Sequence, residues 1–444
     1  MCFLWLLAFA WIVPAVRGAD HPNIVLILAD DLGYGDLGCY GHPVAKTPNI
    51  DQLAKQGVRF TQHYSNGPEC SPTRTALLTG RYQQRVGGLE CAIGTGNVGR
   101  YDDAIRLAEQ HDLGLPVGQA VLPGTLKEVG YSCGVFGKWH LGYEPKFNPM
   151  EYGWDEFFGY LGGNVHYFNH RETSDVHVLF DGRQPVTREG YMTHLITDES
   201  IAFIKKQRDK PFFAYVSHEC PHFPFQGPKD ESKVVTKENW MELNAKTYVA
   251  MLEDLDSEVG RLLTAIDQAG VAKNTVVVFV SDNGGFAGAG NMGPLRGSKS
   301  TTFEGGIRVP LIIRWPDRIE PNQTSDQVSA TFDLTKSFLS LAGADLPEDQ
   351  LDGFDVIKHI VQKSDDVSRT LFWRGRRGDR AWSAVRDGDM KYVHKREGGS
   401  SEEWLFDLSK DISESNDLAI KRSPKLMRLG KSLADWDADV KPSR

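Results

Sequence analysis

The strongest constraint on the fold is a set of apolar runs in which polar residues do not alternate with apolar ones. Asn23–Ala29, Pro211–Ser217 and Thr275–Ser281 are runs of this kind. A strand with one face in water alternates apolar and polar residues, whereas a strand covered on both faces does not need to. Helical patterns at 198–207 and 246–265 precede the second and the third of these runs. This order predicts an α/β protein with a buried, largely parallel sheet.

Length and charge limit the possible functions. The chain has 444 residues, which is enough for one large α/β domain and a smaller one. Its formal net charge of −9 argues against a general nucleic-acid-binding protein. An anionic substrate would therefore need a local basic pocket.

The N-terminus has the pattern of a secretion signal. Residues 2–16 form an apolar run that has the length of a signal-peptide core and is short for a membrane span. Cleavage after Gly18 would leave Val16 and Gly18 at the small-residue positions. We therefore expect residues 1–18 to be a signal peptide and the mature protein to be secreted or periplasmic, without a stable membrane span. An uncleaved anchor or a misassigned start is the alternative.

The C-terminal part differs from the rest. Short strand-like segments at 370–373, 382–386 and 390–394 predict a small antiparallel sheet, followed by a helix over about 424–436. We accordingly expect a catalytic domain over 19–345 and a C-terminal subdomain over 346–444.

Polar residues follow two of the apolar runs directly. Asp30 and Asp31 follow the first, and Asp282 and Asn283 follow Thr275–Ser281. Adjacent carboxylates repel each other unless a cation compensates them, and their oxygens suit calcium or magnesium better than zinc. We interpret the set as a metal site. Taken separately, each pair could also be a solvated turn.

Cys70 lies where a helix is predicted to begin. Pro72 suits the first helical position and Gly80 follows the last apolar residues. Free backbone N–H groups at such a helix start attract anions and lower the pKa of a thiol. Arg74 lies about one turn further along and could reach the same anion. The pattern indicates a nucleophile beside an oxyanion pocket, or else a small buried cysteine that caps a core helix.

Three further segments carry basic side chains. Lys138 and His140 follow the predicted strand 132–136 and point to the same side of an extended chain, so they could bind an oxyanion and move a proton. A surface lysine and a core histidine are the alternative. His222 follows Pro211–Ser217, and Lys299 lies in a segment rich in glycine and serine. Because ligands bind beyond the carboxyl ends of the strands of open α/β sheets, one crevice could collect these residues.

The motifs resemble those of the type I sulfatases. Cys70-Ser71-Pro72-Thr73-Arg74, followed by Thr79-Gly80-Arg81, resembles the family signature. Other matching segments occur in the family order between residue 23 and about residue 410, and they include Gly137–Gly142 and Pro221–Pro224. The resemblance implies an alkaline-phosphatase-like α/β sandwich, with a large mixed, mostly parallel sheet and a smaller C-terminal antiparallel sheet.

The resemblance also implies two groups that the sequence does not encode directly. A maturation enzyme would oxidise Cys70 to Cα-formylglycine, whose hydrate is the nucleophile of the family. One calcium ion per chain would be held by Asp30, Asp31, Cys70 after its modification, Asp282 and Asn283.

Roles for the remaining residues follow from the same resemblance. Arg74 would stabilise the hydrated aldehyde, and Lys138 and Lys299 would bind the sulfate. His222 would donate a proton to the leaving oxygen, and His140 would help to deprotonate the hydrate. The implied activity is hydrolysis of a sulfate ester on a saccharide or on a small molecule such as an aryl sulfate.

Several questions stay open at the level of sequence. The segments 147–158 and 164–166 are similar to those of sulfatases that act on galactose- or N-acetylgalactosamine-6-sulfate. Two other functions compete: a phosphonate or phosphate monoester hydrolase, and a secreted carbohydrate-binding pseudoenzyme. The irregular stretch 85–119 is interpreted as a pocket rim. Residues that could face the substrate are Tyr160, Asn164, His166 and Tyr167, and residues that could form disulfides or stay buried thiols are Cys39, Cys91, Cys133 and Cys220.

Overall fold

The computed structural model describes residues 21–94, 101–173, 179–344, 350–419 and 423–442. The expected signal peptide, residues 1–18, lies outside the described residues, and so does the expected boundary between the catalytic domain and the C-terminal subdomain at residue 345.

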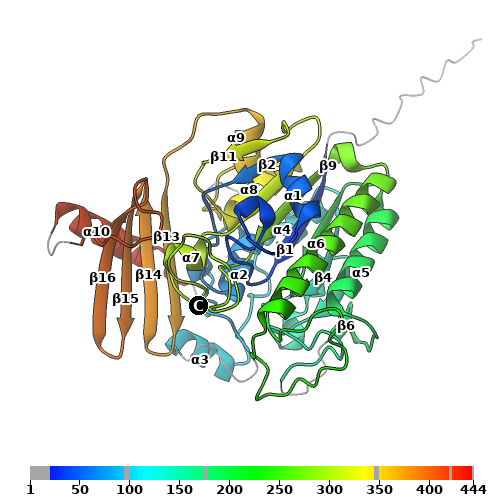
Figure 1. Ribbon diagram of the computed structural model, residues 1–444, viewed down its shortest axis with the longest axis horizontal. Coiled ribbons are helices and arrows are strands. Elements are labelled where there is room, and N and C mark those ends of the chain that lie inside the picture. Colours follow the sequence, from blue (N-terminus) through cyan, green and yellow to red (C-terminus); the bar gives the residue numbers. More distant parts are fainter. Residues whose placement is uncertain (1–20, 95–100, 174–178, 345–349, 420–422, 443–444) are drawn as a thin grey trace, which may run out of the picture.

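A large sheet of ten strands forms the centre of the protein (Figure 1). Strand β1 (Asn23–Ala29) is fully buried and pairs in parallel with β8 (Phe212–Ser217) and with β9 (Thr275–Ser281). Strand β4 (Ser132–Lys138) pairs in parallel with β8, and β5 (Glu156–Tyr160) pairs in parallel with β4. The apolar runs of the sequence are therefore the central strands, as predicted.

The edges of this sheet are antiparallel or mixed. Strand β10 (Leu311–Arg314) runs antiparallel to both β9 and β2 (Val58–Phe60), and β2 pairs in parallel with β11 (Gln323–Ser325). On the other side, β6 (Leu179–Asp181) is antiparallel to β5 and to β7 (Gln184–Pro185). A separate parallel pair joins β3 (His63–Tyr64) to β12 (Ser329–Ala330).

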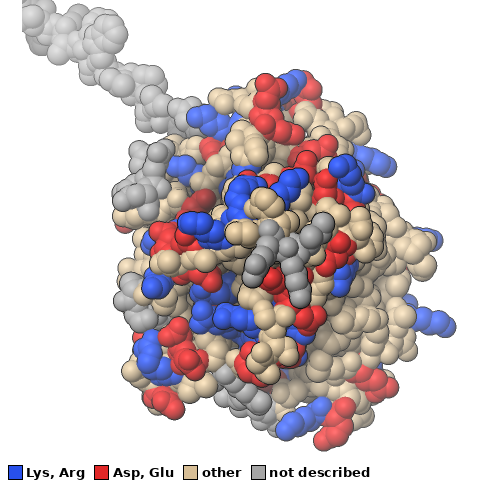
Figure 2. Space-filling view, turned by 90° about the vertical axis from the view of Figure 1, so that its left-hand side faces the viewer, with Lys and Arg blue, Asp and Glu red and all other residues tan. Residues whose placement is uncertain are grey.

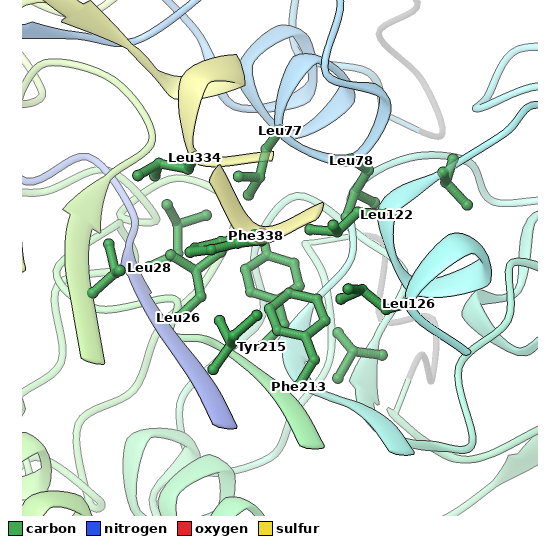
Figure 3. Packing of buried hydrophobic residues seen from close by; sticks show 14 of the residues in the cluster. Leu26, Leu28, Leu77, Leu78, Leu122, Leu126, Phe213, Tyr215, Leu334 and Phe338 are labelled. Atoms are coloured by element: carbon green, nitrogen blue, oxygen red, sulfur yellow. The ribbon is translucent and has the colours of Figure 1, made fainter. Parts of the chain in front are cut away.

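Helices cover both faces of the large sheet, which explains the lack of alternation in β1. One face packs against α1 (Pro48–Lys55), α5 (Met192–Gln207) and α6 (Ala245–Gln268). The other packs against α2 (Cys70–Thr79), α4 (Leu122–Glu128), α8 (Thr331–Leu341) and α9 (Val356–Val361). Figure 3 shows Leu26 and Leu28 of β1 among residues of α2, α4 and α8. The intervening Val25 and Ile27 face the opposite layer.

The C-terminal sheet is an antiparallel meander. Its strands are β13 (Thr370–Arg377), β14 (Arg380–Asp387), β15 (Met390–Glu397) and β16 (Ser400–Asp407), and α10 (Pro424–Asp439) packs against β14 and β15. The prediction of a small antiparallel sheet is confirmed, although the strands are longer than expected. Its core includes Tyr82, Phe303 and Phe332 from the first part of the chain, so the two sheets share one apolar interface.

Short helices complete the fold. The stretch 85–119, expected to be irregular, contains α3 (Asp102–Glu109), whose Ala104 and Leu107 are buried. Helix α7 is Glu304–Ile307. The 3₁₀ helices are η1 (Gly38–Tyr40), η2 (Gln83–Arg85), η3 (Pro145–Phe147), η4 (Pro149–Glu151) and η5 (Ala272–Asn274).

Two further properties concern the described part of the chain. Its cysteines are free thiols, and four are buried: Cys70, Cys91, Cys133 and Cys220. Cys39 is partly exposed. Within the described residues, each helix is too short or too polar to cross a membrane.

Candidate active site

The carboxyl ends of four central strands and the start of α2 meet at one place. Asp30 and Asp31 follow β1, Asp282 and Asn283 follow β9, Lys138 ends β4, and the segment after β8 carries His222. Helix α2 begins at Cys70, two residues before Pro72, so the proline is the third helical residue and not the first as predicted. All these side chains are buried, and that of Lys299 is 12% exposed.

Each carboxylate of the site has a cationic partner. Lys138 pairs with Asp30, and the Lys299 ammonium lies 2.7 Å from Oδ1 of Asp31. Arg74 donates from Nε and Nη2 to Oδ2 of Asp282, at 3.1 and 3.0 Å. Burial raises the pKa of Asp31, but the charges of Lys299, His222 and Lys138 outweigh it and lower this pKa to about 2. Asp31 is therefore a carboxylate under all ordinary conditions.

The Cys70 thiol lies among these charges. Its Sγ is 3.2 Å from Oδ1 of Asp30 and 3.5 Å from the ammonium of Lys299. Burial, followed by the charges of Asp282 and Asp30, raises the pKa of the thiol well above its usual value. The expectation that the helix start lowers this pKa is wrong, because the nearby carboxylates and the loss of solvent outweigh the helix dipole. An unmodified Cys70 is thus a poor nucleophile.

The two histidines are neutral and differently oriented. Burial lowers the pKa of both His140 and His222 well below the usual value. Nδ1 of His222 lies 2.7 Å from the carbonyl of Phe223, so the proton is on Nδ1 and Nε2 can accept a hydrogen bond from Lys299 at 3.2 Å. Nε2 of His140 lies 2.5 Å from the carbonyl of Ile93, and its Nδ1 has no hydrogen-bond partner in the part of the chain that the structure describes.

The donor set fits a hard divalent cation. Ligand atoms of Asp30, Asp31, Cys70 and His222 lie within 4.8 Å of one another. Asn283 adds its Oδ1, which is buried and accepts no hydrogen bond from any described residue, while its Nδ2 donates to Asp31 at 2.7 Å. Oxygen atoms of carboxylates and amides are ligands suited to calcium. Asp282 lies beside this group, because its Oδ1 accepts the backbone N–H of Asp31.

A cavity of about 660 Å³ opens above Cys70. Cys70, His140, His222 and Lys299 line it, whereas Lys138 is buried behind Asp30 and does not. Of the four residues expected to face the substrate, Asn164 lines the cavity, and Tyr160, His166 and Tyr167 do not.

Several residues of the site had no signal in the sequence. Ser217 accepts a hydrogen bond from Nη1 of Arg74 at 2.6 Å and so fixes the guanidinium. Other residues of the cavity wall are Glu69, Tyr143, Glu172, Lys237, Trp240 and Arg377. They come from separate loops and from β13, and no local motif marks them. Ala92, Ile93 and Gly94, in the stretch interpreted as a pocket rim, do line the cavity.

Comparison with known families identifies the arrangement. Residues 22–344 match the family described as sulfatase, and residues 298–435 match the C-terminal region described for N-sulphoglucosamine sulphohydrolase. The chain belongs to the sulfatase family. It is therefore a sulfuric ester hydrolase by descent, and the resemblance stated from the motifs is confirmed.

Individual sulfatases are similar over most of the chain. N-acetylgalactosamine-6-sulfatase of Rattus norvegicus is 35% identical over 380 residues, which cover 81% of this chain and 69% of the relative. Arylsulfatase A of Homo sapiens is 32% identical over 443 residues, which cover 93% and 82%. The crystal structure of Ps i-CgsB in complex with k-i-k-neocarrahexaose superposes with a TM-score of 0.83 at 31% identity, covering 95% of this chain and 94% of the other. The sulfatase fold here is alkaline-phosphatase-like, as predicted.

Proposed function

We propose that this sulfatase hydrolyses a sulfate ester on a carbohydrate, after oxidation of Cys70 to formylglycine and with a bound calcium ion. The observation that carries the proposal is the position of Cys70, between Asp30 and Lys299 at the floor of a cavity of about 660 Å³. The similar protein Ps i-CgsB was crystallised with a neocarrahexaose, and the rat relative is named for a sulfated sugar. Aryl sulfates are the alternative substrates, because arylsulfatase A is also similar.

The raised pKa of Cys70 supports the modification. A thiol that stays protonated cannot attack a sulfate ester, so the position needs another nucleophile. Formylglycine would supply the hydroxyl group of a hydrated aldehyde in its place. Calcium held by Asp30, Asp31, Asp282 and Asn283 would add positive charge next to the sulfate oxygens.

The remaining residues provide charge and proton transfer. Lys299 lines the cavity and can bind a sulfate oxygen directly, whereas Lys138 acts from behind Asp30, so its predicted contact with sulfate stays a prediction. His222 lines the cavity beside Lys299, and in its protonated form it would donate a proton to the leaving oxygen. His140 lines the cavity, and burial lowers the pKa of its ring, so a neutral His140 would serve as the base that deprotonates the hydrate. Arg74 holds Asp282 in place.

Two experiments on the protein from its native host, or co-expressed with a maturation enzyme, test the proposal. The tryptic peptide Phe60–Arg74 carries Cys70, and its mass should be lowered by the conversion of CH₂SH to CHO. The protein should release sulfate from sulfated sugars faster than phosphate from the corresponding phosphate esters. Cys70→Ala should abolish this release, while Cys39→Ser, at a partly exposed thiol outside the cavity, should not change it. An unmodified peptide from an inactive protein would favour the carbohydrate-binding pseudoenzyme.

The N-terminal pattern completes the proposal. We infer that the protein acts after export, either secreted or in the periplasm, since the apolar run 2–16 has the length of a signal-peptide core. N-terminal sequencing of the mature protein should begin at residue 19.

A further inference from the structure

The C-terminal sheet contributes one arginine to the cavity above Cys70. Arg377 is the last residue of β13, and among the described residues it is the member of this sheet that lines the cavity. Its side chain is 35% exposed, whereas that of its partner Glu69 is 5% exposed. The guanidinium therefore lies at the wall of the cavity with the carboxylate behind it.

Glu69 fixes the position of this guanidinium. Nη2 and Nε of Arg377 lie 2.6 and 3.2 Å from the two carboxylate oxygens. The same carboxylate accepts hydrogen bonds from Ser300 Oγ at 2.9 Å and from the backbone N–H of Ala92 at 2.7 Å. Burial raises the pKa of Glu69, but the charge and hydrogen bond of Arg377 outweigh it, so the pKa lies below its usual value. Glu69, itself held by Ser300 and by the backbone of Ala92, thus fixes one edge of the arginine before any ligand binds.

The Nη1 group of Arg377 is available to a ligand. Within the described residues, Nη1 takes part in no hydrogen bond or ion pair. Nη2 also lies 3.5 Å from the carbonyl oxygen of Ala92, so Nη1 supplies the remaining donors, and a guanidinium N–H group held in this way is suited to an oxygen of a carboxylate or sulfate. Lys237, an exposed residue from the loop before α6, lines the same cavity and adds positive charge to it.

The positive charge of Arg377 and Lys237 belongs to the cavity wall and is not a property of the chain as a whole. The chain carries a net charge of −9, and Figure 2 shows acidic and basic side chains interspersed over the face of the molecule on the side of the C-terminal sheet. In the proposed function Lys299, which lines the same cavity, would bind the scissile sulfate. Glu69 compensates the charge of Arg377 through Nε and Nη2, so Nη1 is the group that a ligand in the cavity can still engage.

We propose that Arg377, assisted by Lys237, binds a second anionic group of the substrate, either a uronate carboxylate or a second sulfate. The proposal rests on the proposed function and narrows its substrate class to saccharides with two anionic groups. Because Glu69 is adjacent to Cys70 in the chain, the second group belongs to the sulfated sugar itself or to the sugar next to it.

The test distinguishes two roles of Arg377, which are direct binding of the substrate and positioning of Glu69. Arg377→Gln alone would leave Glu69 buried without its cation, so the informative comparison is Glu69→Gln against the double variant Glu69→Gln/Arg377→Gln. Three substrates are assayed: a monosulfated N-acetylhexosamine, the same sugar linked to a uronate, and its disulfated form. Arg396→Gln is the surface control, since this exposed arginine of β15 lines a different cavity.

The expected result is a loss restricted to doubly anionic substrates. Removing Arg377 from the Glu69→Gln background should raise KM about tenfold for one or both of these, the loss expected for one charge-assisted contact. The monosulfated sugar should keep its KM and kcat. The substrate whose KM rises identifies the second anionic group as a carboxylate or a sulfate. Equal losses on all three substrates, or a loss in kcat alone, would mean that Arg377 only positions Glu69 and would overturn the proposal.

Binding provides a readout that does not need turnover. The same three compounds are titrated calorimetrically into Cys70→Ala, with and without the Glu69→Gln/Arg377→Gln pair. Binding of the doubly anionic compounds that depends on Arg377 supports the subsite even if the wild-type protein releases no sulfate, and in that case the proposed function fails alone. If the affinities for the doubly anionic compounds do not change when Arg377 is replaced, the proposed subsite is wrong, whether or not the wild-type protein releases sulfate.

Discussion

Replacing Lys391 should weaken the junction between the two sheets. Lys391 of β15 is fully buried, and its ammonium lies 2.7 Å from Oε1 of Glu304 and 2.9 Å from Oε1 of Glu414. Glu304 begins α7, five residues after Lys299, and it also pairs with Arg308 at 3.1 Å. The variant Lys391→Met keeps the length of the side chain and removes the charge between two buried carboxylates.

The size of the effect follows from the partners that remain. Glu304 keeps Arg308, whereas Glu414 loses the one cation that pairs with it among the described residues. Removing one partner of a buried pair costs about 3–5 kcal/mol, because the other charge is left without compensation. We therefore expect Lys391→Met to lower the free energy of unfolding by that amount at about pH 8.

The effect should depend on pH in a defined direction. Burial raises the pKa of Glu414 to about 7, although Lys391 lowers it. A carboxyl group whose pKa is higher in the folded than in the unfolded state favours folding at low pH, and this contribution is lost as the pH rises through the folded pKa. Without Lys391 the folded pKa of Glu414 rises further. The deficit of the variant should then be smaller at about pH 5, where Glu414 is protonated, than at about pH 8.

Urea unfolding followed by tryptophan fluorescence at the two pH values measures this deficit. The double variant Lys391→Met/Glu414→Gln should recover part of the loss and reduce the difference between the two pH values. Lys431→Met, at a lysine of α10 that is 75% exposed, should change stability by less than about 0.5 kcal/mol. A loss below about 1 kcal/mol for Lys391→Met, or an equal loss at both pH values, would refute the reasoning.

Two other perturbations test the metal site and the core. Calcium at a hundredfold excess over Kd should add about 2.7 kcal/mol to the free energy of unfolding of the wild-type protein and so raise its melting temperature relative to EDTA, and Asp282→Asn should reduce this rise. Equal shifts of the melting temperature in both proteins would argue against the site. Phe338→Ala should cost about 3–5 kcal/mol in urea unfolding, because Phe338 of α8 is fully buried against Leu26 and Phe213 (Figure 3). Phe338→Leu, the milder control, should lose less, and a loss below about 1 kcal/mol for the alanine variant would contradict the packing.

The central strands could be predicted because their burial is recorded in the sequence itself. The bounds of β1 and β9 are those of the apolar runs, and the polar residues that follow them meet as expected at the carboxyl ends of the strands. The insertion of β10 between β9 and β2, antiparallel to both, could not be predicted, since strand order depends on contacts between distant segments. Helix α3 was missed because it has only two buried residues within a glycine-rich stretch.

The candidate site also has features that could be predicted from the sequence and features that could not. The helix start at Cys70 was recognised from local residues, but its effect on the thiol was misjudged, because Asp30 and Asp282 arrive from other strands. The pair of Glu69 and Arg377 joins segments 308 residues apart, so no spacing rule could reveal it. Local patterns located the chemical groups, and the tertiary structure determined their ionisation and their partners.

The position of β1 has a consequence for synthesis. This strand is the first to leave the ribosome, yet both of its neighbours, β8 and β9, are made much later. An unpaired apolar strand can pair with the same segment of another chain. Strands β13–β16, by contrast, pair with their neighbours in sequence and can form as they emerge. The yield of folded protein should therefore depend more on what shields residues 23–29 during translation than on changes within the C-terminal sheet.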